Sequence, residues 1–301
     1  QHARLLDALL GALTSSSSPD ELSETWQRVA VHFDLLLDRP EAVDALEQTI
    51  LQLAVRGLLV PQETEDESGE VLLEQIRAQR QRLIDEGVVK RDKSLPAIAT
   101  GDAPFNLPTG WAWARLGAIA NFIDYRGKTP TKTAGGTPLI TAKNVRQGFI
   151  NREPREFIAT QSYDGWMTRG IPKVGDLLVT TEAPLGNVAQ IDIHERFALA
   201  QRVICLGLYE LKMSGALASF LQSPWMQSAL AGQSSGVTAQ GIKSARLQLM
   251  PIPVPPLAEQ ARIATRVEEL RRYWAELRRR LTSMGATQDL LAQALLGRDA
   301  H

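Results

Sequence analysis

Apolar residues near the start of the chain recur at helical spacing. Residues 1–18 resemble a short amphipathic helix followed by a polar hinge. After them an apolar stripe advances in alternating steps of four and three, which predicts a helix that begins at the Ser18 N-cap and ends before Pro40. A second stripe predicts a helix from Pro40 to about Gly57, and a third helix is predicted over residues 71–87 with Gly87 at its C-cap. The two stripes consist of Leu22, Trp26, Val29, Phe33 and Leu36, and of Val43, Leu46, Ile50 and Leu53.

The last fifty residues have the most regular pattern in the chain. The same alternation of four and three continues from Ile263 to Leu295, which predicts one long coiled-coil helix that needs another helix against its apolar face. Gly285 is a candidate kink or break. The Arg clusters beside this seam are typical of solvated coil faces. The seam begins with Ile263, Val267, Leu270, Trp274, Leu277 and Leu281, and continues through Met284, Gln288, Leu291 and Leu295.

Two helical segments of the chain resemble each other. Residues 48–57, "QTILQLAVRG", align without gaps on residues 288–297, "QDLLAQALLG". If this echo is a true repeat, equivalent helices begin and end the unit between them.

The pattern changes to short strands between the helical arms. Runs such as "WAWARL", "TPLITA", "DLLVTT", "NVAQI" and "ALAQRVICLGL" have strand composition, and Gly, Pro and Asn separate them. One helix is predicted over residues 214–232, and the alternate prolines of "LMPIPVPP" require an extended chain. The predicted fold is α+β, with one mixed α/β domain flanked by N-terminal helices and a long C-terminal coiled-coil helix. Its expected divisions are residues 1–40, 41–100, 101–256 and 257–301.

Charge is distributed unevenly along this nearly neutral chain. The formal net charge is −1, yet residues 104–256 contain 15 Lys and Arg against 9 Asp and Glu, whereas the rest contains 18 against 25. Residues 125–148 hold five cations and no carboxylate. A basic module favours a polyanionic partner, although a solvated surface loop also fits this composition.

Composition excludes several other classes of site. The single cysteine, Cys205, rules out an internal disulfide and suits a reducing cytoplasm, which is the expected location. Four scattered histidines give no zinc spacing, and no metal site is expected. No apolar run is long enough for a bilayer, and the first residues do not resemble a signal peptide.

Several segments resemble, in order, the landmarks of one known family. They are "ILQLAVRGLLVPQ", "LPTGWAWARLGAI", "TPLITAKNVRQGFI", "KVGDLLVTTEAPLGNVA", "AQRVICL", "GVTAQGI" and "IPVPPLAEQARI". Together they are similar to the specificity (S) subunit of Type I restriction–modification systems. That subunit carries two target-recognition domains, whereas this sequence contains one, so it resembles a half-subunit or a two-domain subunit cut after its first half.

The resemblance implies a role for each part of the chain. Residues 101–256 would be a target-recognition domain for one half of a bipartite site in double-stranded DNA. The helices would hold methyltransferase (modification) subunits and, where present, restriction subunits. No cofactor is expected in this chain, because S-adenosylmethionine would belong to the methyltransferase, and ATP and Mg to a restriction subunit. We expect the N-terminal stripes to cover part of the long seam and a second copy to cover the rest, which gives a homodimer.

The candidate DNA contacts lie mainly in and after the acid-free stretch. Lys and Arg neutralise phosphates, and Thr, Asn and backbone amides fix the register. Arg reads guanine, and Asn or Gln reads adenine. The candidates are Arg126, Lys128, Thr129, Lys132, Lys143, Asn144, Arg146, Gln201, Arg202, Gln240 and Lys243.

No motif indicates catalysis by this chain, and we expect it not to be an enzyme. It has no P-loop, no Asn/Asp-Pro-Pro-Tyr/Phe motif of amino-methyltransferases and no nucleophile elbow. Glu210 and Lys212, with Asp192 upstream, form a chance-level match to a metal-dependent nuclease. The alternatives are therefore a helical protein–protein scaffold with a β recognition module, or a stand-alone nuclease.

Overall fold

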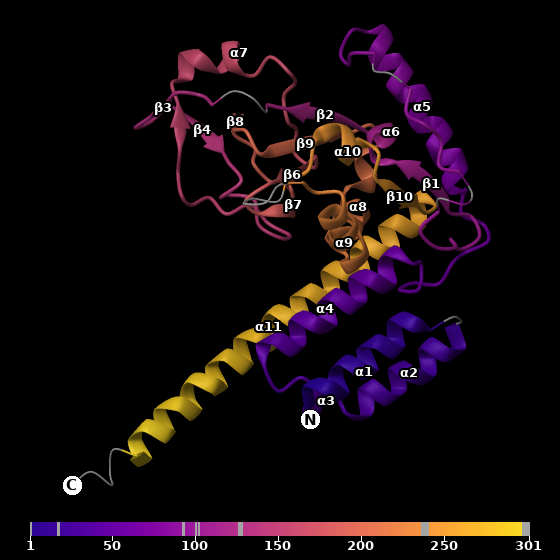
Figure 1. Ribbon diagram of the computed structural model, residues 1–301, viewed down its shortest axis with the longest axis vertical. Coiled ribbons are helices and arrows are strands. Elements are labelled where there is room, and N and C mark those ends of the chain that lie inside the picture. The colour runs from indigo at the N-terminus through magenta and orange to yellow at the C-terminus, as the bar shows by residue number, and fades with distance from the viewer. Residues whose placement is uncertain are drawn as a thin grey trace. The chain divides into compact units, whose positions relative to one another are not determined.

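The chain folds into two compact units. The computed structural model describes residues 2–16, 19–91, 94–99, 101, 103–125, 129–235 and 241–296. Unit 1 consists of residues 1–60 and 265–301, and unit 2 of residues 61–264 (Figure 1). The predicted segments 41–100 and 257–301 are therefore each divided between the two units.

Unit 1 is entirely helical. It contains α1 (His2–Ser15), α2 (Pro19–Val31), α3 (Phe33–Leu36), α4 (Pro40–Val55) and the larger part of α11 (Leu257–Leu296). The helix predicted between Ser18 and Pro40 is interrupted at His32, where α3 starts a new turn. The second predicted helix begins at Pro40, as expected, and Gly57 follows it with φ of 72°. The core of unit 1 is formed by the apolar faces of α1, α2, α4 and α11.

Part of the α11 seam is covered within the chain. Trp274 is buried in the core of unit 1, and Leu270, Leu277 and Leu281 pack against that core. Ion pairs flank this contact, from Arg271 to Glu47 at 3.0 Å and from Arg278 to Asp44 at 2.6 Å. The N-terminal stripes therefore act as the partner helices of the seam from Leu270 to Leu281, in keeping with the prediction that they cover part of it.

Unit 2 is built around an antiparallel four-stranded sheet. Its strand order is β2-β9-β6-β7, formed by β2 (Ala120–Asp124), β9 (Val203–Leu208), β6 (Leu177–Thr181) and β7 (Leu185–Gln190). All five residues of β6 are buried, because strands flank it on both edges and the core and helices cover its faces. Strands β6 and β7 form a hairpin in which Val179 is paired with Val188 and Thr181 with Leu185.

Two smaller sheets complete the strand framework of unit 2. One has the order β3-β5-β4-β8, with β3 (Lys132–Thr133), β5 (Phe157–Ile158), β4 (Thr137–Ile140) and β8 (Ala198–Leu199). It shares a core with the first sheet, in which Leu139, Leu178 and Cys205 are all buried. The other pairs β1 (Ala112–Arg115) with β10 (Pro251–Val254), so the proline-rich run is extended as predicted.

Helices lie around these sheets. They are α5 (Gly69–Asp85), α6 (Leu116–Ile119), α7 (Tyr163–Trp166), α8 (Ser214–Gln222), α9 (Pro224–Gly232) and α10 (Ser244–Gln248), with 3-10 turns at Thr160–Ser162 and Leu211–Met213. The single helix predicted over residues 214–232 is two helices, because Ser223 is extended and its side chain caps α9 by accepting from Met226 N. The C-cap of α5 is Glu86, and Gly87, the expected C-cap, follows it one residue later with φ of 72°. The α+β fold class is confirmed.

A buried carboxyl joins the first turn of α11 to the β1 segment. Glu259 is 1% exposed, and its Oε2 accepts a 3.0 Å hydrogen bond from Trp111 Nε1. Burial raises the pKa of this carboxyl above its ordinary value of 4.5. The proton is therefore bound more tightly in the folded chain. The stability that it contributes is fully present below pH 4.5 and is lost as the pH rises through the folded pKa.

We predict that Glu259→Gln removes this pH dependence. Glutamine keeps an acceptor oxygen for Trp111 but does not ionise. The variant's free energy of unfolding, relative to that of the wild type, should therefore increase as the pH rises from about 4 towards neutrality. Urea denaturation at a series of pH values measures the difference, and a difference that is constant with pH would contradict the assignment.

Candidate nucleic-acid interface

The segment after β4 is fixed by the side chain of Asn144. This residue is 1% exposed, and its Oδ1 accepts from the N–H and hydroxyl of Thr141, both at 2.9 Å. Its Nδ2 donates to the carbonyls of Asn151 and Pro154, both at 3.0 Å. The expectation that Asn144 reads a base is therefore wrong, because the buried amide already uses both of its donors and has its acceptor occupied twice.

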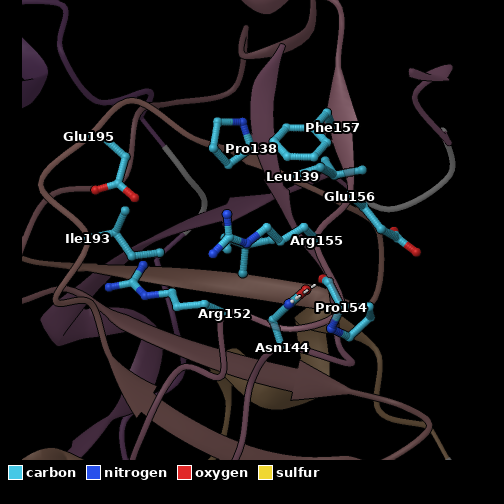
Figure 2. A pocket seen from close by; sticks show the side chains of 11 residues that line it. Pro138, Leu139, Asn144, Arg152, Pro154, Arg155, Glu156, Phe157, Ile193 and Glu195 are labelled. Atoms are coloured by element: carbon cyan, nitrogen blue, oxygen red, sulfur yellow. Dashed lines mark hydrogen bonds between the residues drawn. The ribbon is translucent and has the colours of Figure 1, made fainter. Parts of the chain in front are cut away.

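A cavity of about 300 Å³ lies beside this network (Figure 2). Its wall is largely apolar, with Pro138, Leu139 and Phe157 on one side and Ile193 on another. The arginines in its lining are paired, Arg152 with Asp192 at 3.0 Å and Arg155 with Glu153 at 3.0 Å, and Glu156 and Glu195 also line it. The balanced charge of this lining does not favour phosphates.

The end of the β6–β7 hairpin has a different character. Thr181 N donates to Arg202 O at 2.9 Å, and Thr181 O accepts from Ile242 N at 3.0 Å. These bonds bring the turn before β9 and the start of α10 to the same strand end. Arg202, with φ of 72°, extends its guanidinium to Glu182 at 2.7 Å, and Lys243 is exposed beside them.

A second cationic turn is attached to the partner strand of the hairpin. Asn187 Nδ2 donates to Val145 O at 2.9 Å, Val188 N to Gln147 Oε1 at 2.9 Å, and Gly148 N to Val188 O at 2.8 Å. These bonds hold the turn of residues 145–150 against the middle of β7. Arg146 is exposed in this turn, and Lys143 is exposed just before it.

Candidates far apart in the sequence therefore lie on segments that are hydrogen-bonded to the two strands of one hairpin. We define the hairpin-end surface as Lys143, Arg146, Gln201, Arg202 and Lys243. Its cations provide the positive potential that a phosphate backbone requires. Gln201 is half-buried in the turn before β9, next to Arg202.

The remaining candidates lie elsewhere or outside the described residues. Lys132 is in β3 and pairs with Glu156 at 2.7 Å. Thr129 is exposed and lines a separate hollow with Trp166. Arg126, Lys128 and Gln240 lie outside the described residues.

Comparison with known proteins decides the family. Residues 108–282 match the family described as Type I restriction modification DNA specificity domain. The chain belongs to this family. The resemblance found from the ordered landmarks is thus confirmed.

The chain is also similar to individual members of this family. It is 34% identical over 304 residues to the specificity subunit of the Type I restriction enzyme EcoAI of Escherichia coli, across 98% of this chain and 51% of that subunit. It is 29% identical to the EcoEI specificity subunit, also of Escherichia coli, across 98% of this chain and 51% of that protein. The chain thus spans about half the length of these relatives.

A solved structure of a type I R-M system contains a chain of the same fold. The two chains are 21% identical, with a TM-score of 0.51 over 76% of this chain and 56% of the other. This likeness supports the fold assignment of the specificity-domain family.

Three residues of this specificity domain were not among the sequence candidates. Glu182 neutralises Arg202, while Gln147 and Asn187 anchor the turn of residues 145–150 to β7. Their signal in the sequence is weak, because "VRQGF" and "LGNVA" have ordinary turn and strand composition. The residues become important only when the hairpin brings them together.

The residues considered for nuclease chemistry have structural roles. Glu210 Oε1 accepts from Lys212 N at 3.0 Å and caps a 3-10 turn, and Asp192 pairs with Arg152. Across the part of the chain that the structure describes, no group of three or more His, Cys, Asp or Glu could hold a metal ion. In the same described ranges, no helix is long and apolar enough to cross a membrane. The nuclease alternative is not supported.

We predict that Asn144→Ala destabilises the domain by about 2–4 kcal/mol, because it leaves backbone groups of residues 141, 151 and 154 without partners in a buried site. Denaturant unfolding measures the loss. Gln201→Ala, in a half-buried turn, is the matched control and should cost less than about 1 kcal/mol. Equal stabilities of Asn144→Ala and the wild type would contradict the structural role.

Proposed function

We propose that this chain is a non-catalytic DNA-specificity subunit that binds one half of a bipartite site in double-stranded DNA. The observation that carries the proposal is that Lys143, Arg146, Arg202 and Lys243 are exposed on segments hydrogen-bonded to the two strands of the β6–β7 hairpin. Membership of the specificity-domain family supports it. A scaffold that recognises a protein is less favoured, since exposed cations gathered from three separate segments match phosphates better than an apolar protein surface.

The proposed partners follow from the family and from the absence of catalytic motifs in the sequence. Methyl transfer would be performed by methyltransferase subunits that bind S-adenosylmethionine. ATP and Mg would be used by a restriction subunit where one joins the complex. The chain itself would determine which DNA sequence is bound, because its cations position the DNA and its polar side chains read bases.

Within the hairpin-end surface, the orientation and exposure of each side chain indicate whether it would contact a phosphate or a base. Lys143, Arg146 and Lys243 are exposed and suit phosphates. Arg202 is oriented by Glu182, and a guanidinium with a fixed direction suits bidentate recognition of a guanine edge. Gln201 beside it suits adenine.

The salt dependence of DNA binding tests this proposal. Replacing Lys143, Arg146 and Lys243 together with Ala should weaken binding to a mixed-sequence duplex. The slope of log K against log salt should decrease by about 0.9 for each of these cations that contacts a phosphate. Fluorescence anisotropy at several salt concentrations measures both quantities.

A matched control separates local contact from overall charge. Arg266, Arg272 and Arg279 are exposed on α11 and pair with glutamates of the same helix. Their replacement by Ala changes the net charge equally but should leave the slope unchanged. Glu182→Gln, which removes a carboxylate from the hairpin end, should act in the opposite direction and strengthen binding. If the hairpin-end variant binds as the wild type does at every salt concentration, the DNA-binding proposal is wrong.

We also propose that two copies of the chain associate through the end of α11. Leu290, Leu291 and Leu295 are 66%, 59% and 65% exposed. In the similar segment of α4, the residues that align with them are Ile50, Leu51 and Val55, which are 3%, 1% and 0% exposed. The same apolar pattern is therefore covered in one helix and uncovered in the other. Coverage by a second copy would make a two-fold homodimer, which requires an inverted-repeat target.

A charge at this uncovered face tests the assembly. Leu291→Glu should convert a dimer to a monomer without lowering the stability of unit 1, and light scattering measures the mass. Thr282→Glu, exposed on the opposite side of the helix from Leu291, is the control. Leu277 is not suitable for this test, because it packs inside unit 1. A wild-type chain that is monomeric both alone and with a methyltransferase subunit would contradict the homodimer.

A further inference from the structure

An aromatic pair outside the hairpin-end surface is held in a fixed position. Trp166, at the end of α7, is half-buried, and its Nε1 donates to Leu199 O at 2.9 Å. Its ring stacks on that of Tyr125, with centroids 5.7 Å apart and planes inclined by 24°. The Tyr125 hydroxyl accepts from Arg169 N at 2.9 Å and donates to Gly170 O at 3.0 Å. Neither ring needs to reorganise in order to receive a ligand.

Trp166 forms part of the wall of an open hollow of about 450 Å³. We call this hollow the Trp166 groove; its lining is Thr129, Pro130, Thr131, Ile158, Ser162, Gly165 and Trp166. The three hydroxyl residues are exposed, and they come from two segments that approach through the pairing of β3 with β5. Figure 1 shows α7 and β3 at the same side of unit 2.

The electrostatic surroundings of the groove favour an anion. Two of its hydroxyl residues, Thr129 and Thr131, lie in the acid-free stretch of residues 125–148. Among the residues that line the groove, none carries a carboxylate. Asp164 is nearby but has Arg196 at 3.9 Å, and the guanidinium of Arg169 lies over the Tyr125 ring, 5.9 Å from its centroid. The cavity in Figure 2, by contrast, has Glu156 and Glu195 in its lining.

Resting on the proposed DNA-binding function, we infer that the Trp166 groove holds a stretch of sugar–phosphate backbone of the bound DNA. The hydroxyls of Thr129, Thr131 and Ser162 would donate to phosphate oxygens, and the exposed face of Trp166 would pack against a deoxyribose. Hydroxyl contacts of this kind fix the register of a protein on DNA without reading its sequence. The indole N–H is already used within the protein, so the ring offers a face and no donor to a base edge.

The groove suits an extended chain better than a small free anion. Among the described residues that line it there is no Lys or Arg, and hydroxyls alone bind a free phosphate weakly in water. A duplex that the cations of the hairpin-end surface already attract presents other phosphates to unit 2 at a raised local concentration. The hydroxyls then act on a ligand that is held in place by other contacts.

Gly165 provides a direct probe of the groove. It lines the groove, and a Cβ added there meets nothing within 4 Å, so a side chain fits without disturbing its neighbours. Gly165→Asp introduces a carboxylate into the groove, and Gly165→Asn introduces a side chain of the same shape without the charge. The full chain of each variant is titrated with a labelled duplex of mixed sequence, and thermal unfolding confirms that both are folded.

We expect Gly165→Asp to weaken duplex binding at least about fivefold, because like charges placed against each other are unfavourable, and Gly165→Asn to stay within about twofold of the wild type. The loss should be equal for duplexes of different sequence, as for a backbone contact. Unchanged duplex affinity of Gly165→Asp would overturn the inference. A variant that lost methyltransferase binding but kept its duplex affinity would make the groove a protein interface, which also overturns it.

Failure of this inference can be distinguished from failure of the proposed function. If the Lys143, Arg146 and Lys243 variant loses affinity while Gly165→Asp does not, the chain binds DNA and the groove lies outside the contact. If neither variant changes duplex binding, the DNA-binding function is itself wrong.

Discussion

The candidate interface depends on the two backbone hydrogen bonds of Thr181. Because β6 is buried along its whole length, only its end can present residues to a ligand. At that end, one residue is bonded to the turn before β9 through its N–H and to the start of α10 through its carbonyl. At the other end, the buried carboxylate of Asp176 accepts from Lys173 N at 2.9 Å and from Leu208 N at 3.2 Å. A strand held at both ends is a rigid base on which exposed side chains can be positioned.

The sequence was informative wherever structure depends on periodic burial. The seam of α11 and the stripe of α4 were predictable residue by residue, because a helix that covers a core must repeat its apolar positions. The extended run ending in Val254 was predictable because alternate prolines forbid helix. The break at Ser223 was missed, since both halves of that segment are apolar and Pro224 fits the first turn of a helix as well as a loop.

The candidate site was predictable in composition but not in direction. The sequence shows that Asn144 is a polar residue in a basic segment, and it does not show whether the amide faces solvent or the carbonyls of residues 151 and 154. An amide has equal capacity for base edges and for backbone groups, and only the fold of residues 141–154 determines the outcome. Lys132 illustrates the same limit. It adds to the count of basic residues in its segment, yet in the fold its charge is paired with that of Glu156. The convergence of Arg202 and Lys243 depends on strand pairing, which single-sequence patterns do not specify.

The apolar seam of the long helix α11 is covered in one part of the helix and exposed in another. Where Trp274 is buried, the apolar seam is satisfied inside the chain, and the ion pairs of Arg271 and Arg278 fix its register against α4. Beyond Met284 the seam continues with the same spacing, but its leucines are exposed. A helix stabilised over its first half transmits its direction to the second half, since the hydrogen bonds between successive turns make it stiff. In the proposed homodimer, the exposed end of α11 would therefore be the part of the helix that meets the second copy.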